Sequence, residues 1–286
     1  MPIVVPPLLA KHCERTAERR AWLRALPTAI SSLQERWGIS LGPPFEHEYV
    51  SCSWVAPATL ADGNKAVLKV GMPHMEAEQE IEGLRFWNGD PTVRPLEFDG
   101  SRHAMLLERC EPGDSLLSIP ESEQDVIIAG LLRRLWKKPQ QQAFRPLSAL
   151  VACWSEETRR AQDQWSDGTL VNEGLQMFAK LSREPNENVL LATDLHAGNV
   201  LRARREPWLV IDPKPFVGDP TYDLTQHLLN CEQRLQTDAE GLIQRCAELA
   251  EVDAERVRLW LFARMAAEPR QNWQSWKTAL AMRLLR

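Results

Sequence analysis

Two stretches of the sequence decide which fold and function we expect for this chain. They are residues 190–201, LLATDLHAGNVL, and residues 208–214, WLVIDPK. Short apolar runs flank a polar turn, a pattern typical of brief strands on either side of a loop. The turn holds a carboxylate at Asp194 and an amide at Asn199, and a second carboxylate, Asp212, ends the next apolar run. Because Mg²⁺ prefers hard oxygen ligands, we expect Asn199 and Asp212 to bind magnesium. Asp194 is expected to orient and deprotonate an attacking hydroxyl in phosphoryl transfer.

The spacing between the acid and the amide supports this interpretation. Asn199 follows Asp194 by five residues, as the metal-binding asparagine follows the catalytic aspartate in protein kinases. The alternative is a solvated turn in which Asp194 and Asn199 cap the backbone and Asp212 caps the next segment. Six specified residues, each present at about one position in twenty, rarely match by chance, so the pattern favours phosphoryl transfer.

The sequence before this stretch predicts a helical segment followed by a β-rich one. Residues 8–37 carry apolar side chains three or four positions apart, with a break expected at Pro27, and we interpret residues 1–40 as a helical extension. Residues 41–110 are predicted to form a β-rich, nucleotide-binding lobe. Its expected elements are strands at 46–55, 65–70, 92–98 and 103–108 and a helix at 73–87.

The remaining residues, 111–286, predict a mainly helical lobe that carries the catalytic loop and the acceptor site. Apolar stripes of helical period predict helices at 121–136, 147–164, 168–183, 222–231, 239–250 and 254–266. Short β-type runs at 189–191, 200–201 and 208–211 interrupt them. A turn at residues 111–113 separates the two lobes.

Length and charge narrow the classes of function. A chain of 286 residues favours two lobes, since single cores stop growing at about 250–300 residues. The net charge of −5, without a basic tract, argues against nucleic-acid or membrane partners and favours a cationic small-molecule acceptor. The chain has no apolar run of membrane-spanning length and no basic start typical of a signal peptide, so we expect a cytoplasmic protein. Six scattered cysteines without a CxxC pattern argue against a disulfide framework or a cysteine metal site.

The motif stretches together resemble the aminoglycoside phosphotransferases, and within them the streptomycin 6-phosphotransferase and hydroxyurea kinase branch. The similarity is dense from residue 190 to residue 231, where DPKP (212–215), GDP (218–220) and YDL (222–224) follow the catalytic stretch. It extends more thinly over residues 46–265. The resemblance implies an α+β, protein-kinase-like, two-lobed fold, with a small β-rich N-lobe and a mainly helical C-lobe.

The resemblance also implies a set of ATP contacts in the β-rich lobe. Lys69, on an apolar strand, is expected to hold phosphates, and Glu80 on the following helix to orient it, with Glu76 as the alternative acid. Ser51 and Ser53 stand where the family places a phosphate-covering loop, and they offer hydroxyl and backbone donors instead of a GxGxxG loop.

The segment 106–110 resembles the hinge between the lobes of this family. Backbone groups around Glu108 and Cys110 are expected to bind adenine. Asp223 resembles a position that supports the catalytic loop without touching substrate. The chain departs from the family just before the proposed base. Family members often have the sequence His-Gly-Asp there, with the aspartate as the base, whereas this chain has Ala192-Thr193-Asp194 and so lacks the usual supporting histidine.

We therefore expect an ATP- and Mg²⁺-dependent O-phosphotransferase for a small-molecule hydroxyl, most directly a streptomycin-type aminoglycoside. Two alternatives stay open: a kinase for hydroxyurea or another small metabolite, and a nucleotide-binding pseudokinase without turnover. His196 is expected to be a loop-packing residue rather than a metal ligand. Acids that could face a cationic acceptor are Glu232, Asp238, Glu240 and Glu268, although each could equally lie on a solvated helix face.

Overall fold

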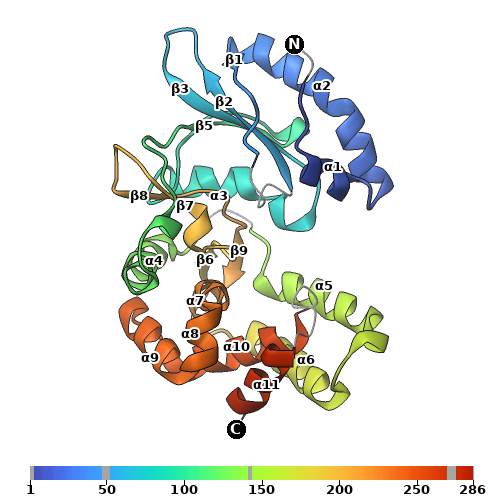
Figure 1. Cartoon of the computed structure of the whole chain (residues 1–286), viewed down its shortest axis with the longest axis vertical. Coiled ribbons are helices and arrows are strands. Elements are labelled where there is room, and N and C mark those ends of the chain that lie inside the picture. Colours follow the sequence, from blue (N-terminus) through green and yellow to red (C-terminus); the bar gives the residue numbers. More distant parts are fainter. Residues whose placement is uncertain (1–2, 47–51, 141–143, 269–274, 286) are drawn as a thin grey trace. The chain divides into compact units, whose positions relative to one another are not determined.

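The computed structural model describes residues 3–46, 52–140, 144–268 and 275–285 (Figure 1). The chain divides into two compact units. The first unit contains residues 1–114 and 201–211, and the second contains residues 115–200 and 212–286. The first unit is therefore built from two separate segments of the chain.

A five-stranded antiparallel sheet forms the first unit, with the strand order β1-β2-β3-β5-β4. Its strands are β1 (Ser40–Leu41), β2 (Ser53–Thr59), β3 (Lys65–Gly71), β4 (Pro95–Asp99) and β5 (Ala104–Glu108). Side chains alternate between the two faces of a strand, so Leu68 and Lys69 on β3 lie on opposite faces. Leu68 belongs to the core under the N-terminal helices, which leaves the other face for Lys69.

Two N-terminal helices, α1 (Pro7–Cys13) and α2 (Ala17–Trp37), pack on that core (Figure 1). Thr16 Oγ1 accepts a hydrogen bond from the main-chain N–H of Arg19 and so caps α2. The break expected at Pro27 was wrong, because α2 continues through it. Pro27 lies on the exposed side of the helix, where water can replace the missing hydrogen bond. Burial of the apolar stripe formed by Leu26, Ile30 and Leu33 stabilises the helix on both sides of Pro27.

A second apolar cluster joins both chain segments of the first unit. Helix α3 (Glu80–Trp87), shorter than the expected 73–87, follows a 3₁₀ turn at Met75–Ala77. Its residue Leu84 packs with Met105 of β5 and with Leu209 of β8 (Trp208–Val210). The main-chain N–H of Val93 donates to the carbonyl of Val210 at 3.0 Å, which ties the later segment to the earlier one.

The second unit is mainly helical (Figure 1). Its helices are α4 (Glu121–Leu135), α5 (Leu147–Arg160), α6 (Gly168–Arg183), α7 (Pro220–Asn230), α8 (Glu232–Thr237), α9 (Ala239–Ala250), α10 (Ala254–Ala267) and α11 (Ser275–Leu284). Trp260 of the buried helix α10 lies edge-on to Tyr222 of α7, with ring centroids 5.1 Å apart. Gly174 of α6 allows close packing, since a Cβ there would lie 2.6 Å from the Cβ of Ala266. Helices α8 and α11 were not predicted from the sequence.

Short strands support the predicted catalytic stretch. In the second unit, β6 (Val189–Leu191) pairs antiparallel with β9 (Phe216–Gly218), which was also not predicted. Strand β7 (Val200–Arg202) pairs with β8. Among the described residues, no helix is both long and apolar enough to cross a membrane.

Candidate active site

The loop after β6 brings Asp194 and Asn199 together. Residues Ala197–Asn199 form a 3₁₀ turn, and the side-chain amide of Asn199 donates to the main-chain oxygen of Asp194 at 3.0 Å. The His196 ring accepts a hydrogen bond from the main-chain N–H of Gly198, so it caps this turn. Burial lowers the pKa of His196, and the nearby Asp212 carboxylate partly offsets this effect.

Asp223 of α7 holds the start of this loop by hydrogen bonds to its main chain. Its carboxylate accepts hydrogen bonds from the main-chain N–H groups of Ala192 (2.9 Å) and Thr193 (2.6 Å) and from the Trp136 indole (3.1 Å). Complete burial raises the pKa of Asp223 to about 6, although these hydrogen bonds favour the ionised form. These contacts support the start of the loop, and the expectation that Asp223 does not touch substrate stays a prediction.

Thr193 links the loop of Asp194 to the loop of Asp212. Its Oγ1 donates to the main-chain oxygen of Lys214 at 2.6 Å, and the N–H of Lys214 donates to the oxygen of Ala192 at 2.8 Å. Thr193 has a φ of +49°, a conformation that is costly for a β-branched residue. The buried hydroxyl contact compensates for that strain and supplies support in a loop that lacks the usual histidine.

The predicted magnesium ligands offer suitable oxygen atoms. The amide nitrogen of Asn199 is engaged by Asp194, which turns the amide so that its oxygen remains the atom for a cation. Asp212 has a φ of +53° and an ion pair with Lys214, and its side chain is 34% exposed. Asn199 and Asp212 carry the hard oxygen atoms that Mg²⁺ prefers, and Mg²⁺ binding here stays a prediction.

In the first unit, Lys69 lies beside Glu80. Their side chains form an ion pair of 2.5 Å between Lys69 Nζ and Glu80 Oε1, and both side chains are at least 94% buried. Glu80 begins α3, where a carboxylate also interacts favourably with the helix dipole. The arrangement can present an ammonium group in a fixed position, and its role toward ATP phosphates stays a prediction.

The other residues predicted to bind the nucleotide are placed as follows. Ser51 lies outside the described residues, and Ser53 is the first residue of β2, opposite Gly71 of β3. The main-chain N–H of Glu108 donates to the oxygen of Arg94, so a contact between its backbone and adenine can involve only its carbonyl. Cys110 is buried, and burial raises the pKa of its thiol to about 12.

Arg205 is a residue of this region whose contacts sequence reasoning missed. Its guanidinium binds both carboxylate oxygens of Glu108, at 3.2 and 3.0 Å, and donates to the carbonyls of Gly89 and Thr92. A fork of parallel donors matches a carboxylate well. Arg205 therefore fastens residues 201–211 to the end of β5, where the adenine contacts are predicted.

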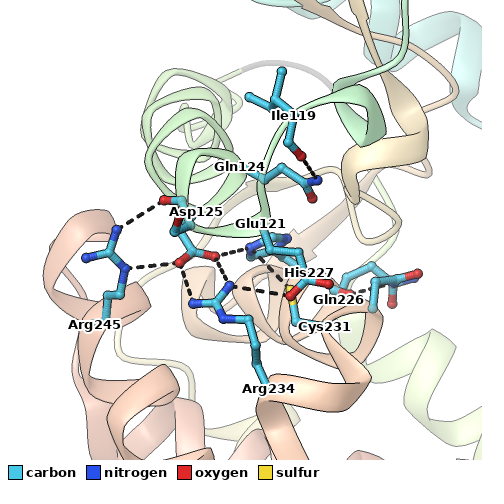
Figure 2. Close-up of polar contacts among 11 residues, drawn as sticks. Ile119, Glu121, Gln124, Asp125, Gln226, His227, Cys231, Arg234 and Arg245 are labelled. Atoms are coloured by element: carbon cyan, nitrogen blue, oxygen red, sulfur yellow. Dashed lines mark hydrogen bonds and ion pairs between the residues drawn. The ribbon is translucent and has the colours of Figure 1, made fainter.

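A polar cluster around the buried Asp125 and His227 joins α4, α7, α8 and α9 in the second unit (Figure 2). The Asp125 carboxylate accepts two hydrogen bonds from Arg234 (3.0 and 2.7 Å), one from Arg245 (3.0 Å) and one from the His227 ring (2.8 Å). Burial would raise the pKa of Asp125, but the hydrogen bonds from His227, Arg234 and Arg245 outweigh it and hold the pKa below its usual range.

The same cluster could be mistaken for a metal site. Asp125, His227 and Cys246 offer ligand atoms within 4.8 Å of one another. Two guanidinium groups already occupy the carboxylate, however, and would repel a cation. We assign the cluster a structural role, which is to hold α7 against its neighbours.

The four acids considered for acceptor binding differ in their surroundings. Glu268 is buried and paired with Arg264 (2.8 Å), so it does not offer a solvent-facing carboxylate to an acceptor. Asp238 caps α9 by accepting from the N–H of Gly241. Glu232 accepts from Gln236 on the same helix, and Glu240 lies near Arg258.

These two units form a protein-kinase-like fold, as predicted. The solved structure of choline kinase LicA from Streptococcus pneumoniae matches with a TM-score of 0.60 at 13% identity, covering 92% of this chain and 98% of that chain. The chain belongs to the aminoglycoside/hydroxyurea antibiotic resistance kinase family, whose model matches residues 37–272. This membership confirms the resemblance inferred from the motifs.

Two curated relatives support the assignment. Streptomycin 6-kinase of Streptomyces griseus is 34% identical over 98% of this chain and 94% of its own length. Hydroxyurea phosphotransferase of Kitasatospora aureofaciens is 33% identical over 87% of this chain and 74% of its own length. The protein is thus a phosphotransferase that acts on a hydroxyl group, and its kinase relatives imply the use of ATP.

Proposed function

We propose that this enzyme transfers the γ-phosphoryl group of ATP to a hydroxyl of a streptomycin-type aminoglycoside, with Mg²⁺. The observation that carries the proposal is the 34% identity to a streptomycin 6-kinase over nearly the whole chain. The pairing of Asp194 with Asn199 in one loop supports it, because phosphoryl transfer needs a base and oxygen ligands near each other.

Each candidate residue has a distinct task in this proposal. Asp194 orients the acceptor hydroxyl and takes its proton as the new P–O bond forms. Lys69, held by Glu80, neutralises phosphate oxygens, and its burial strengthens that interaction. Asn199 and Asp212 would hold Mg²⁺, which neutralises phosphate charge when bound. The nucleotide is proposed to contact the main-chain carbonyl of Glu108, backbone groups of Cys110 and the hydroxyl of Ser53.

The test is a panel of streptomycin, other aminoglycosides, hydroxyurea and amino alcohols, each assayed for ADP release and for the mass of the product. We expect streptomycin to gain one phosphoryl group and to stimulate ADP release. An Asp194→Asn variant should lower kcat by about 10² or more while the KM for ATP changes little. ATP consumption that no acceptor stimulates, with no phosphorylated product, would instead support a nucleotide-binding module.

A second candidate is phosphorylation of hydroxyurea, which the similarity to hydroxyurea phosphotransferase favours. The two acceptors differ in charge, since an aminoglycoside is polycationic and hydroxyurea is neutral. Salt weakens attraction between exposed charges, because the Debye length shrinks from about 10 Å at 0.1 M salt to about 3 Å at 1 M. The KM for a polycationic aminoglycoside should rise steeply with salt while kcat changes little. A best acceptor whose KM is independent of salt would overturn the aminoglycoside assignment.

A further inference from the structure

The Asp194 carboxylate has a side-chain partner that the sequence did not reveal. Gln226 of α7 donates from its amide Nε2 to Asp194 Oδ1 at 2.9 Å. Gln226 is 32 residues away in the sequence, and neither the motif pattern nor the family resemblance pointed to it. The contact lies within the second unit and acts directly on the group proposed as the base.

Arg264 of α10 determines which end of the Gln226 amide faces Asp194. Its Nη2 donates to Gln226 Oε1 at 2.7 Å. A guanidinium group has only donors, so the amide must turn its oxygen toward Arg264 and its NH₂ group toward Asp194. The orientation of the amide is therefore fixed by its surroundings.

Arg264 itself cannot move easily. It is 2% exposed, and it donates to Glu268 Oε2 and to Thr225 Oγ1, both at 2.8 Å. Its guanidinium carbon also lies 5.0 Å from the centre of the Tyr222 ring. The hydroxyl of Thr225 donates its proton to the carbonyl of Tyr222, so its oxygen acts as the acceptor toward Arg264. These contacts hold the guanidinium of Arg264 in place, so it donates to Gln226 from a fixed position.

We propose that Gln226 is a positioning residue for Asp194, oriented by Arg264, and that it fixes the rotation of the Asp194 carboxylate toward the acceptor hydroxyl. The proposal rests on the assignment of Asp194 as the base. Correct geometry at this carboxylate matters because a misplacement of about 1 Å can cost about 10²-fold in rate. Substrate and nucleotide binding, in contrast, should depend little on Gln226.

Gln226→Glu tests this role with almost no change of shape. The new carboxylate can still accept from Arg264, so the fold is expected to be retained, but when ionised it cannot donate to Asp194 and it repels that carboxylate. We expect kcat to fall at least about tenfold, with the KM for ATP and for the acceptor within about twofold of the parent. Gln244→Glu on the exposed face of α9 makes the same chemical change as a control and should leave both constants unaltered.

A double-mutant cycle separates positioning from a general effect on structure. If Gln226 acts through Asp194, Gln226→Glu should change kcat by less than about twofold in an Asp194→Asn background. An equal loss in both backgrounds, or a parental kcat in Gln226→Glu, would overturn the inference alone. A parental kcat in Asp194→Asn by itself would overturn the base assignment and this inference with it.

Discussion

Replacing Thr193 with valine should weaken both stability and catalysis, because it removes one hydroxyl and keeps the side-chain shape. Thr193 Oγ1 donates to the buried carbonyl of Lys214, and Thr193→Val leaves that oxygen without this donor. An unsatisfied buried acceptor costs about 1–3 kcal/mol. At about 2–4 °C per kcal/mol for a unit of this size, a middle value of about 2 kcal/mol lowers Tm by about 4–8 °C.

The matched control is Thr193→Ser, which keeps the hydroxyl and removes the methyl group from a residue with φ +49°. Its Tm should equal or exceed that of the parent, because a serine tolerates this backbone conformation better than a β-branched residue. The link between the loops of Asp194 and Asp212 predicts that kcat falls about tenfold in Thr193→Val and little in Thr193→Ser. Thermal unfolding and steady-state kinetics measure both effects, and equal behaviour of the two variants would refute this reasoning.

Four further substitutions address the ion pairs and the proposed ligands. Glu80→Gln should lower Tm and raise the KM for ATP about tenfold, since breaking a buried ion pair costs about 3–5 kcal/mol and releases Lys69. An unchanged KM for ATP would contradict the proposed role of Glu80 in orienting Lys69. The lowered pKa of Asp125 stabilises the fold above the unfolded-state pKa of about 3.9, and this stabilisation is lost as the pH falls. The Tm difference between the parent and Asp125→Asn should therefore shrink below about pH 4, and a constant difference from pH 7 to 3 would rule this out. Asp212→Ala should lose more activity than Asn199→Ala, and added Mg²⁺ should rescue the latter in part; unchanged Mg²⁺ affinity in both variants would exclude them as ligands.

The fold was predictable where the pattern was long and periodic. Helices α6 and α9 begin and end where their apolar stripes do, because a stripe of twelve or more residues contains several helical turns. Strand β9 has only two apolar residues, Phe216 and Val217, between Pro215 and Gly218, and a run bounded by proline and glycine is typical of a turn. Helix α2 runs through Pro27 because burial against the sheet, which local propensity does not include, decides its length.

The site was predictable only in part, for a physical reason. Asp194 and Asn199 are close in sequence, so their spacing alone brings them into one loop. Gln226 of α7 contacts Asp194 and Arg264 of α10 contacts Gln226, and only the packing of α7 against α10 brings these residues together. No spacing in a single sequence contains that information.

The division of the first unit into two chain segments has a consequence for synthesis on the ribosome. Leu209 completes the apolar cluster around Leu84 and Met105, and Arg205 closes the end of β5. Both residues are translated only after residues 115–200 of the other unit. At about 5–20 residues per second, that delay is roughly 4–17 s. During this interval Leu84 and Met105 lack their contact with Leu209, so the first unit can complete this cluster only after residues 201–211 have been translated.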